Sequence, residues 1–126
     1  MNFNELLAEA KDLLAPKDIN QWVSVGSVAT VLETENNNIY KGVCIDTACS
    51  LGFCAEHSAI AAMITSREYN IKKIVTVNSK GIPIPPCGRC RELMSQITDN
   101  SDKVQIMIGT EKVVSLTALL PNDWKK

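Results

Sequence analysis

The sequence lacks any concentration of positive charge. Its 13 lysine and arginine residues are scattered and are balanced by 14 aspartate and glutamate residues, which gives a net charge of −1. Aromatic residues are also scarce, at 5% of the chain. Proteins that bind long nucleic acids concentrate positive charge on one face. We therefore expect no nucleic-acid polymer among the partners of this protein.

Long apolar runs are missing as well. No run reaches the ~18 residues that a membrane-spanning helix needs, and residues 1–5 lack the basic start and apolar core of a signal peptide. We therefore expect neither a membrane partner nor secretion. Five cysteines are an odd number for a disulfide framework. They favour a reducing compartment, with cytoplasm as the expected location and with thiols that bind metal.

The length and the residue pattern predict one α/β domain over residues 1–126. An amphipathic helix is expected at 4–15, and alternating residues predict a hairpin of strands at 22–31 and 39–45. The further expected elements are a helix at 54–66, a strand at 71–77, a loop at 79–86, a helix at 87–98, strands at 104–109 and 113–114, and a helical turn at 116–120. This alternation of strands and helices predicts layers with partly parallel strands.

Two short motifs have the composition of a metal site: Cys54-x-Glu56 and, further along, Pro-Cys87-x-x-Cys90. Cys87 and Cys90 are three positions apart on the expected helix, so both can bind one ion. Cys54 supplies a third ligand from the start of another helix, where the free N–H groups favour thiolates. A zinc ion with three such ligands keeps its fourth position for water. Glu56 is then placed to move a proton at that position.

The cations near the motifs have an expected supporting role. A zinc ion bound by three thiolates carries a formal charge near −1, which weakens its activation of water. Donors to the thiolates offset this charge. Arg91 is the first candidate donor, followed by Arg89 and His57.

A closed, purely structural zinc site is the main alternative. It needs a fourth protein ligand, and the available residues are His57, Cys44, Cys49 and Glu56. We expect His57 to support or pack near the site rather than to bind the ion. A redox Cys-x-x-Cys pair would leave Cys54 and Glu56 without a role. The pattern therefore favours catalytic zinc, one ion per chain.

The two motifs resemble those of the small zinc-dependent cytidine deaminases, including their blasticidin-S deaminase branch. Val25-Gly26 is similar to a Val-Gly-Ala stretch in the first strand of that family, and Leu-Leu-Pro at 119–121 followed by Trp124 is similar to its ending. The resemblance runs from about residue 24 to residue 124. It implies a three-layer α/β/α sandwich with a mixed, about five-stranded sheet, and a homo-oligomer, with a tetramer expected.

The resemblance also implies an activity: hydrolytic deamination of cytidine or deoxycytidine, with release of ammonia, as in pyrimidine salvage. Glu56 would take a proton from the attacking water and return it to the ring nitrogen and the departing amine. The N–H of Ala55 and the carbonyl of Pro85 are the implied contacts to the base. Trp124 is expected to cover a substrate pocket, often that of a neighbouring subunit. A modified cytosine nucleoside such as blasticidin S is the second expected substrate, and a non-catalytic zinc module is a more remote alternative.

Three departures from the family concern the substrate. The family holds the ribose with an Asn-x-Glu pair, where this chain has Cys44 and Asp46. Cysteine lacks the two-sided hydrogen bonding of an amide, whereas the carboxylate still accepts from a hydroxyl. The family's arginine after Cys-Ala-Glu is His57 here, and its base-stacking phenylalanine is Val23, unless Trp22 takes over. We therefore expect intact zinc chemistry with altered sugar recognition.

Overall fold

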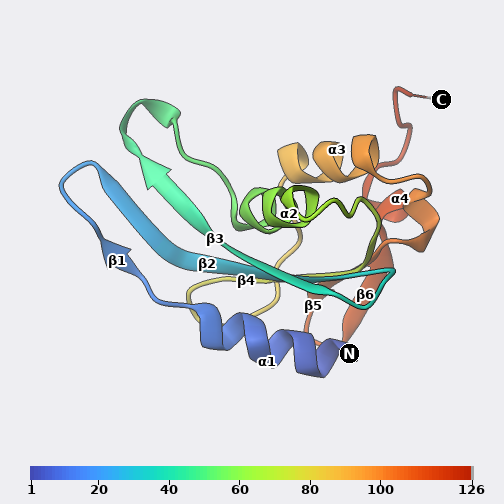
Figure 1. The fold of residues 1–126 in the computed structure, drawn as a ribbon, viewed down its shortest axis with the longest axis horizontal. Coiled ribbons are helices and arrows are strands. Elements are labelled where there is room, and N and C mark those ends of the chain that lie inside the picture. Colours follow the sequence, from blue (N-terminus) through green and yellow to red (C-terminus); the bar gives the residue numbers. More distant parts are fainter. Residues whose placement is uncertain (126) are drawn as a thin grey trace.

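Six strands form one mixed sheet in the computed structural model, which describes residues 1–125, and helices cover both faces of this sheet (Figure 1). The strands are β1 (Lys17–Asp18), β2 (Val23–Thr34), β3 (Ile39–Thr47), β4 (Ile71–Val77), β5 (Gln105–Gly109) and β6 (Lys112–Ser115). The helices are α1 (Phe3–Leu13), α2 (Ala55–Thr65), α3 (Gly88–Ile97) and α4 (Leu116–Leu119), with short 3-10 turns η1 (Ala48–Ser50) and η2 (Ser101–Lys103). No helix within residues 1–125 has the length and apolar character needed to cross a membrane.

The long strand β2 organises the sheet. It pairs with β3 in an antiparallel hairpin on one side and with β4, again antiparallel, on the other. Strand β4 then pairs in parallel with β5, and β5 pairs antiparallel with β6. Parallel neighbours need a crossover connection, and α3 lies in the connection between β4 and β5. The expectation of partly parallel strands is therefore confirmed.

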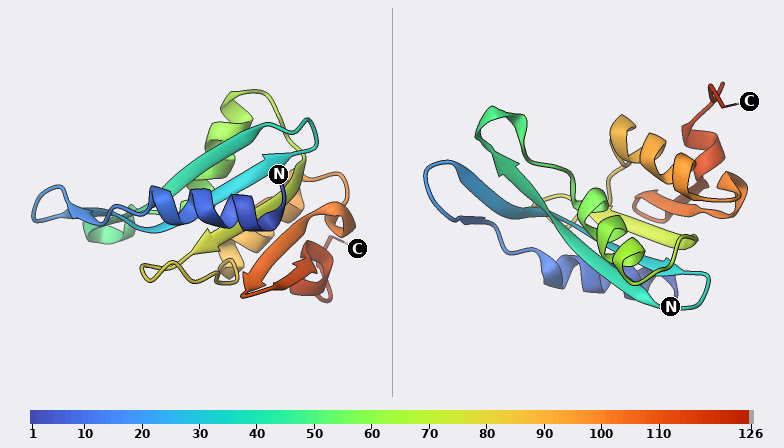
Figure 2. Two further views of the ribbon diagram at one scale, coloured as in Figure 1. Left: turned by 90° about the horizontal axis from the view of Figure 1, so that it is seen from below. Right: turned by 45° about the horizontal axis from the view of Figure 1, so that its top comes forward.

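Two apolar cores, one on each face, produce the three layers (Figure 2). Neighbouring residues of a strand point to opposite faces. On β4, Val75 and Val77 pack with α1, whereas Ile74 packs with α2 and α3. On β2, Val31 and Leu32 divide in the same way. The predicted α/β/α sandwich is thus the observed architecture, with helix α1 alone on one face.

Several element boundaries differ from the sequence prediction. Helix α1 begins at Phe3, before the expected start at residue 4, because Asn2 caps it in a reciprocal capping box with Glu5. Strand β2 continues to Thr34, three residues beyond the expected end, since pairing with β3 and β4 holds it. The two-residue strand β1 was not predicted, because an exposed Lys-Asp pair carries no strand pattern. It adds a sixth strand to the five expected.

Helix α2 lies unusually close to β3, and Gly42 permits this approach. A Cβ atom at Gly42 would stand 2.3 Å from the backbone nitrogen of Ala59 in α2, far inside contact distance. Ser58 ties the same helix to the strand by donating its hydroxyl to the carbonyl of Val43 at 2.7 Å. These contacts fix the position of the α2 N-terminus, where the first motif begins.

Candidate metal centre and active site

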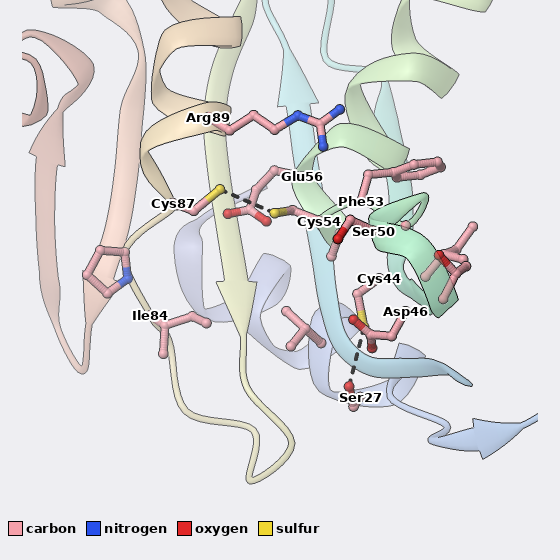
Figure 3. Close-up of a pocket in the computed structure, with 16 residues that line it drawn as sticks. Ser27, Cys44, Asp46, Ser50, Phe53, Cys54, Glu56, Ile84, Cys87 and Arg89 are labelled. Atoms are coloured by element: carbon pink, nitrogen blue, oxygen red, sulfur yellow. Dashed lines mark hydrogen bonds between the residues drawn. The ribbon is translucent and has the colours of Figure 1, made fainter. Parts of the chain in front are cut away.

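The three motif cysteines meet in space. Cys54 is the N-cap of α2, Cys87 is the N-cap of α3, and Cys90 lies in the first turn of α3. Their sulfur atoms all lie within 4.8 Å of one another, a grouping that could hold a metal ion. The Sγ atoms of Cys54 and Cys87 are 3.2 Å apart (Figure 3). The starts of α2 and α3 therefore bring the three sulfur atoms together.

The thiols are crowded in a way that suits a cation. Burial, with the thiol donated to Cys87, raises the pKa of Cys54 to about 11. Burial and the charge of Glu56 raise the pKa of Cys90. At Cys87, burial opposes ionisation, but hydrogen bonds from Cys54 and Cys90 lower its pKa overall. Three thiolates at this spacing require a compensating charge, and soft sulfur ligands with this geometry are typical of zinc.

Glu56 lies beside the sulfur atoms in the first turn of α2 (Figure 3). Its side chain is almost fully buried, with 4% of the residue exposed. Burial raises the pKa of this carboxyl, which brings it closer to the range in which it can both accept and return a proton. Among residues 1–125, the group of possible ligands contains the three cysteines and no fourth side chain. The arrangement therefore lacks the closed coordination that a purely structural site requires.

A cavity of about 550 Å³ opens beside this cluster. Cys54, Cys87 and Glu56 line it at one end, and Ser27, Cys44 and Asp46 line it at the other (Figure 3). Ala55 and Pro85 also belong to the lining, and their contacts to a base stay a prediction. Cys90 is fully buried behind the lining.

The polar end of the cavity contains a residue that the sequence reasoning missed. The Oγ atom of Ser27 lies 3.3 Å from the Sγ atom of Cys44, and the Cys44 thiol donates to Asp46 at 3.7 Å. Ser27 follows Val25-Gly26, where the family pattern has alanine. That departure was the available signal, because it adds a hydroxyl opposite the altered Cys44 position.

An irregular segment between β3 and α2 closes one side of the cavity. Cys49 and Ser50 have positive φ angles of 62° and 56°, a conformation that side-chain-bearing residues rarely adopt. Backbone hydrogen bonds of 3.1 and 2.9 Å between Ile45 and Phe53 tie the segment back to β3. Phe53 thereby becomes a wall of the cavity, a role that the sequence did not suggest. Cys49 itself is exposed and stands outside the sulfur cluster.

The three expected supporting cations occupy different surroundings. Arg91 donates from Nε to the Pro86 carbonyl at 2.8 Å and from Nη1 to the Leu119 carbonyl at 3.2 Å. It thus joins the second motif to α4, and its donation to the thiolates stays a prediction. Arg89 lines the cavity. His57 stacks on Phe53 with ring centroids 4.6 Å apart, outside the cavity lining.

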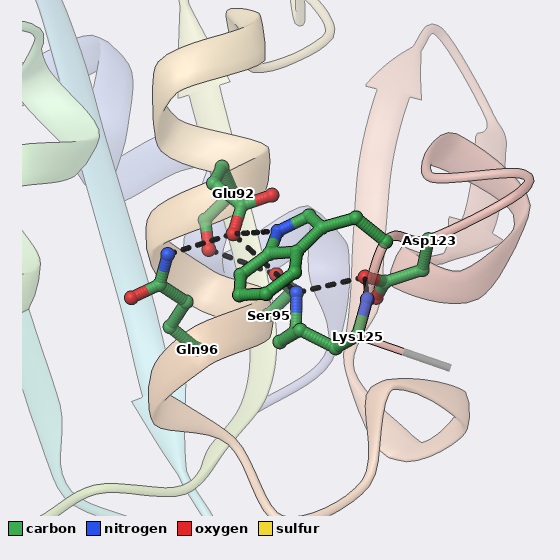
Figure 4. A network of polar contacts seen from close by, with 6 residues as sticks. Glu92, Ser95, Gln96, Asp123 and Lys125 are labelled. Atoms are coloured by element: carbon green, nitrogen blue, oxygen red, sulfur yellow. Dashed lines mark hydrogen bonds and ion pairs between the residues drawn. The ribbon is translucent and has the colours of Figure 1, made fainter.

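Trp124 lies on the outer side of α3. Its indole Nε1 donates to Glu92 at 3.1 Å, and the Lys125 ammonium stands 5.1 Å from the ring centroid. Figure 4 shows Lys125 in the same network with Glu92, Ser95 and Asp123. Trp124 is 72% exposed and does not belong to the lining of the cavity in its own chain. Its expected cover over a neighbouring subunit's pocket therefore stays a prediction.

Comparison with known proteins places these features in a family. A profile described as the cytidine and deoxycytidylate deaminase zinc-binding region matches residues 4–108, which include both cysteine motifs. The cytidine deaminase of Sporosarcina psychrophila is 27% identical over 129 aligned positions, covering 100% of this chain and 93% of that protein. The cytidine deaminase of Mycoplasma genitalium is 34% identical over 95 positions, covering 72% of this chain and 73% of that protein.

Solved structures show the same fold. The cytidine deaminase of Mycobacterium leprae superposes with a TM-score of 0.80 at 23% identity, covering 97% of this chain and 99% of that one. The enzyme of Mycobacterium tuberculosis gives a TM-score of 0.81 at 19% identity, with 98% of each chain covered. At these identities the likeness concerns the fold, whereas the profile match extends over both metal motifs. The chain therefore belongs to the family of zinc-dependent cytidine and deoxycytidylate deaminases.

Proposed function

We propose that this protein removes the exocyclic amine of a free cytosine-type nucleoside by hydrolysis, at one zinc ion held by Cys54, Cys87 and Cys90. The observation that carries the proposal is the position of the three sulfurs and the buried carboxyl of Glu56 at one end of a single cavity. Its volume of about 550 Å³ is within the range of small-molecule sites.

The chemistry divides between the metal and Glu56. Zinc, when bound, supplies a Lewis acid that makes water acidic near neutral pH. Glu56 accepts a proton from the attacking water as its oxygen bonds to the ring carbon that carries the amine. The same carboxyl delivers this proton to the ring nitrogen. It then takes the second proton from the added oxygen, which becomes the carbonyl, and passes it to the amine, so that the carbon–nitrogen bond breaks and ammonia leaves. The raised pKa of Glu56 suits both halves of this exchange.

The cavity lining supports an orientation for the substrate. Ala55 is the first residue of α2, and the N–H groups of a first helical turn lack partners within the helix. Its N–H and the carbonyl of Pro85 are the proposed contacts to the base. The sugar then extends toward Cys44 and Asp46. Because Asp46 carries a negative charge, this end favours a hydroxyl over a phosphate, and hence cytidine or deoxycytidine over a nucleotide.

Two alternatives to a cytidine deaminase activity are a different substrate and a zinc site without catalysis. A modified cytosine nucleoside such as blasticidin S remains the second proposed substrate, since Cys44 and Ser27 leave the sugar end unlike that of the family. A non-catalytic zinc module is disfavoured, because no fourth protein ligand joins the cluster within residues 1–125 and a cavity opens beside it.

We also propose a single domain that assembles as a homotetramer in the cytoplasm and acts in pyrimidine salvage. Exposed apolar side chains support assembly: Trp22 is 61% exposed and Leu51 76% exposed. The Trp22 carbonyl accepts a hydrogen bond from the N–H of Ala48, which places Trp22 beside the 3-10 turn that precedes Leu51. All five cysteines are free, which suits a reducing compartment.

A substrate panel tests the proposed function. Zinc-loaded protein is incubated with cytidine, deoxycytidine, deoxycytidylate, cytosine and blasticidin S, and ammonia release is followed with the absorbance change of the ring. We expect the two nucleosides to be turned over and the nucleotide to react poorly. Exclusive turnover of blasticidin S supports the second substrate, and no ammonia from any compound refutes the proposal.

A further inference from the structure

Two buried threonines lie beneath the first motif helix. Thr30 of β2 and Thr76 of β4 are direct partners in the antiparallel register. Residues two positions away on the two strands, Leu32 and Ile74, pack in the core beneath α2 and α3. Because alternate residues share a face, both threonines also point toward α2. They are 0% and 3% exposed, and their Oγ1 atoms lie 2.6 Å apart.

The direction of the hydrogen bonds of this pair follows from the charge of Glu56. The Thr76 hydroxyl is also bonded to the carboxyl of Glu56. An ionised carboxylate only accepts, so Thr76 donates to Glu56. A hydroxyl has a single proton, so Thr30 donates to Thr76 whenever Thr76 donates to the ionised Glu56. In that protonation state the donors run from Thr30 to Thr76 to Glu56.

The neighbours of the pair on the same face of the two strands, Leu32 and Ile74, are apolar core residues. Buried hydroxyls are costly without partners, and a valine of similar shape suits a buried strand position at no such cost. The fold alone therefore does not call for two threonines at this point. The Glu56 side chain, in contrast, has several rotatable bonds and must present its carboxyl to the cavity. A hydrogen-bond donor on the sheet beneath it, such as the Thr76 hydroxyl, would favour one rotamer of the Glu56 side chain.

We propose that Thr76 is a positioning residue for Glu56, and that Thr30 orients the Thr76 hydroxyl. This inference rests on the proposed function, since it concerns the proton carrier of that reaction. Alignment of a catalytic group is sensitive to small displacements: a misplacement of about 1 Å can cost a factor of the order of 100 in rate. Loss of the Thr76 hydroxyl should therefore lower turnover more than it lowers substrate binding.

Substitution of Thr76 by valine is the central test. We expect kcat for cytidine to fall by about ten- to hundredfold in Thr76→Val, with KM within about twofold and zinc content unchanged. Thr76→Ser keeps the donor and should retain most of kcat. Thr30→Val should lower kcat less, and the double variant should be no worse than Thr76→Val alone, because both residues act through one chain.

A matched control is Thr34→Val, another buried threonine of β2, whose hydroxyl accepts from the N–H of Asn38 in the hairpin turn. It should lower the melting temperature without changing kcat. A crystal structure of zinc-loaded Thr76→Val supplies a second readout, in which the Glu56 carboxyl should adopt a different rotamer. If Thr76→Val does not fold, Thr76→Ser and Thr30→Val carry the same comparison.

The outcomes separate this inference from the proposed function. An active wild-type enzyme with unchanged kcat and an unmoved Glu56 in Thr76→Val overturns the positioning role. A KM increase with constant kcat also overturns it. A wild-type protein inactive on every cytosine compound refutes the proposed function, and the Glu56 rotamer in the variant crystal still decides whether Thr76 positions that side chain.

Discussion

The sulfur atoms of Cys54 and Cys87 lie 3.2 Å apart, although 33 positions separate the two residues in the chain. Each cysteine caps a helix, α2 or α3, and both helices pack on the same face of the sheet. The close approach of α2 to β3 at Gly42 helps to bring the two helix starts together. The metal centre is thus a product of the layered fold as much as of the cysteines.

Zinc content is the first prediction. We expect one zinc per chain in protein purified without chelators, with zinc lost in Cys54→Ala, Cys87→Ala and Cys90→Ala because each variant removes one of three ligands. Elemental analysis measures the content. Cys49→Ala is the matched control, since Cys49 is exposed and outside the cluster. Retention of zinc in the motif variants with loss in Cys49→Ala would contradict the assignment.

Much of this site could be predicted from sequence because its signals are local. The spacing of Cys87 and Cys90 puts both on one helix turn, and the short range from Cys54 to Glu56 places the carboxyl in the first turn of the other helix. Helix periodicity and strand alternation located the main elements. Strand β1 was missed because its pairing with β2 is a tertiary contact, with no pattern in its own residues.

Sugar discrimination is the second prediction. Cys44 and Asp46 replace the family's ribose-binding pair, so we expect similar kcat/KM for cytidine and for sugar-modified cytosine nucleosides. A site that is not built around a hydroxyl does not reject its absence strongly. Steady-state kinetics on both substrate types, with Asp46→Ala in parallel, make the measurement. A strong preference for intact ribose that Asp46→Ala abolishes would show that Asp46 still performs the family's role.

The C-terminal segment provides the third prediction. A Trp124 that covers a neighbouring pocket requires that deletion of residues 122–126 weaken substrate binding while zinc content stays constant. Light scattering should show a homo-oligomer, with a tetramer expected. The contact of Trp124 with Glu92 on its own α3 offers the alternative of a tail docked only within its chain. Unaltered kinetics after truncation, or a monomeric full-length protein, favours that alternative.

The fourth prediction concerns Glu68 and the dependence of folding stability on pH. Donation from the Tyr40 hydroxyl at 2.7 Å, with the Asn38 amide at 2.9 Å, lowers the pKa of this carboxyl to about 2. A lowered folded-state pKa stabilises the protein above the unfolded value, ~4.3 for glutamate. This contribution disappears as the pH falls toward 2.

Glu68→Gln should therefore be less stable than wild type at pH 7, and the difference should shrink between about pH 4 and pH 2. Thermal melts of both proteins at several pH values measure it, and loss of zinc in acid affects the two proteins alike. Tyr40→Phe removes the strongest donor and should show the same trend. A difference that stays constant from pH 7 to pH 3 argues against this role for Glu68.

The features that escaped prediction all depend on contacts between distant segments. Ser27 meets Cys44 only because β2 and β3 form the hairpin beside the cavity. Thr76 meets Glu56 only because α2 packs on the face of the sheet toward which Thr76 points, and neither local sequence indicates this contact. The hydrogen bond of Arg91 to the Leu119 carbonyl likewise depends on where the chain returns after β6.

Turnover of cytidine by zinc-loaded wild type and Glu56→Gln, measured side by side as ammonia release, tests the central claim most directly. The wild type should convert cytidine with one ammonia per molecule. Glu56→Gln should keep its zinc and its fold but lose about 10²–10⁴ in kcat, the usual size of a general acid–base contribution. Near wild-type turnover in Glu56→Gln, with zinc present in both proteins, would contradict the account.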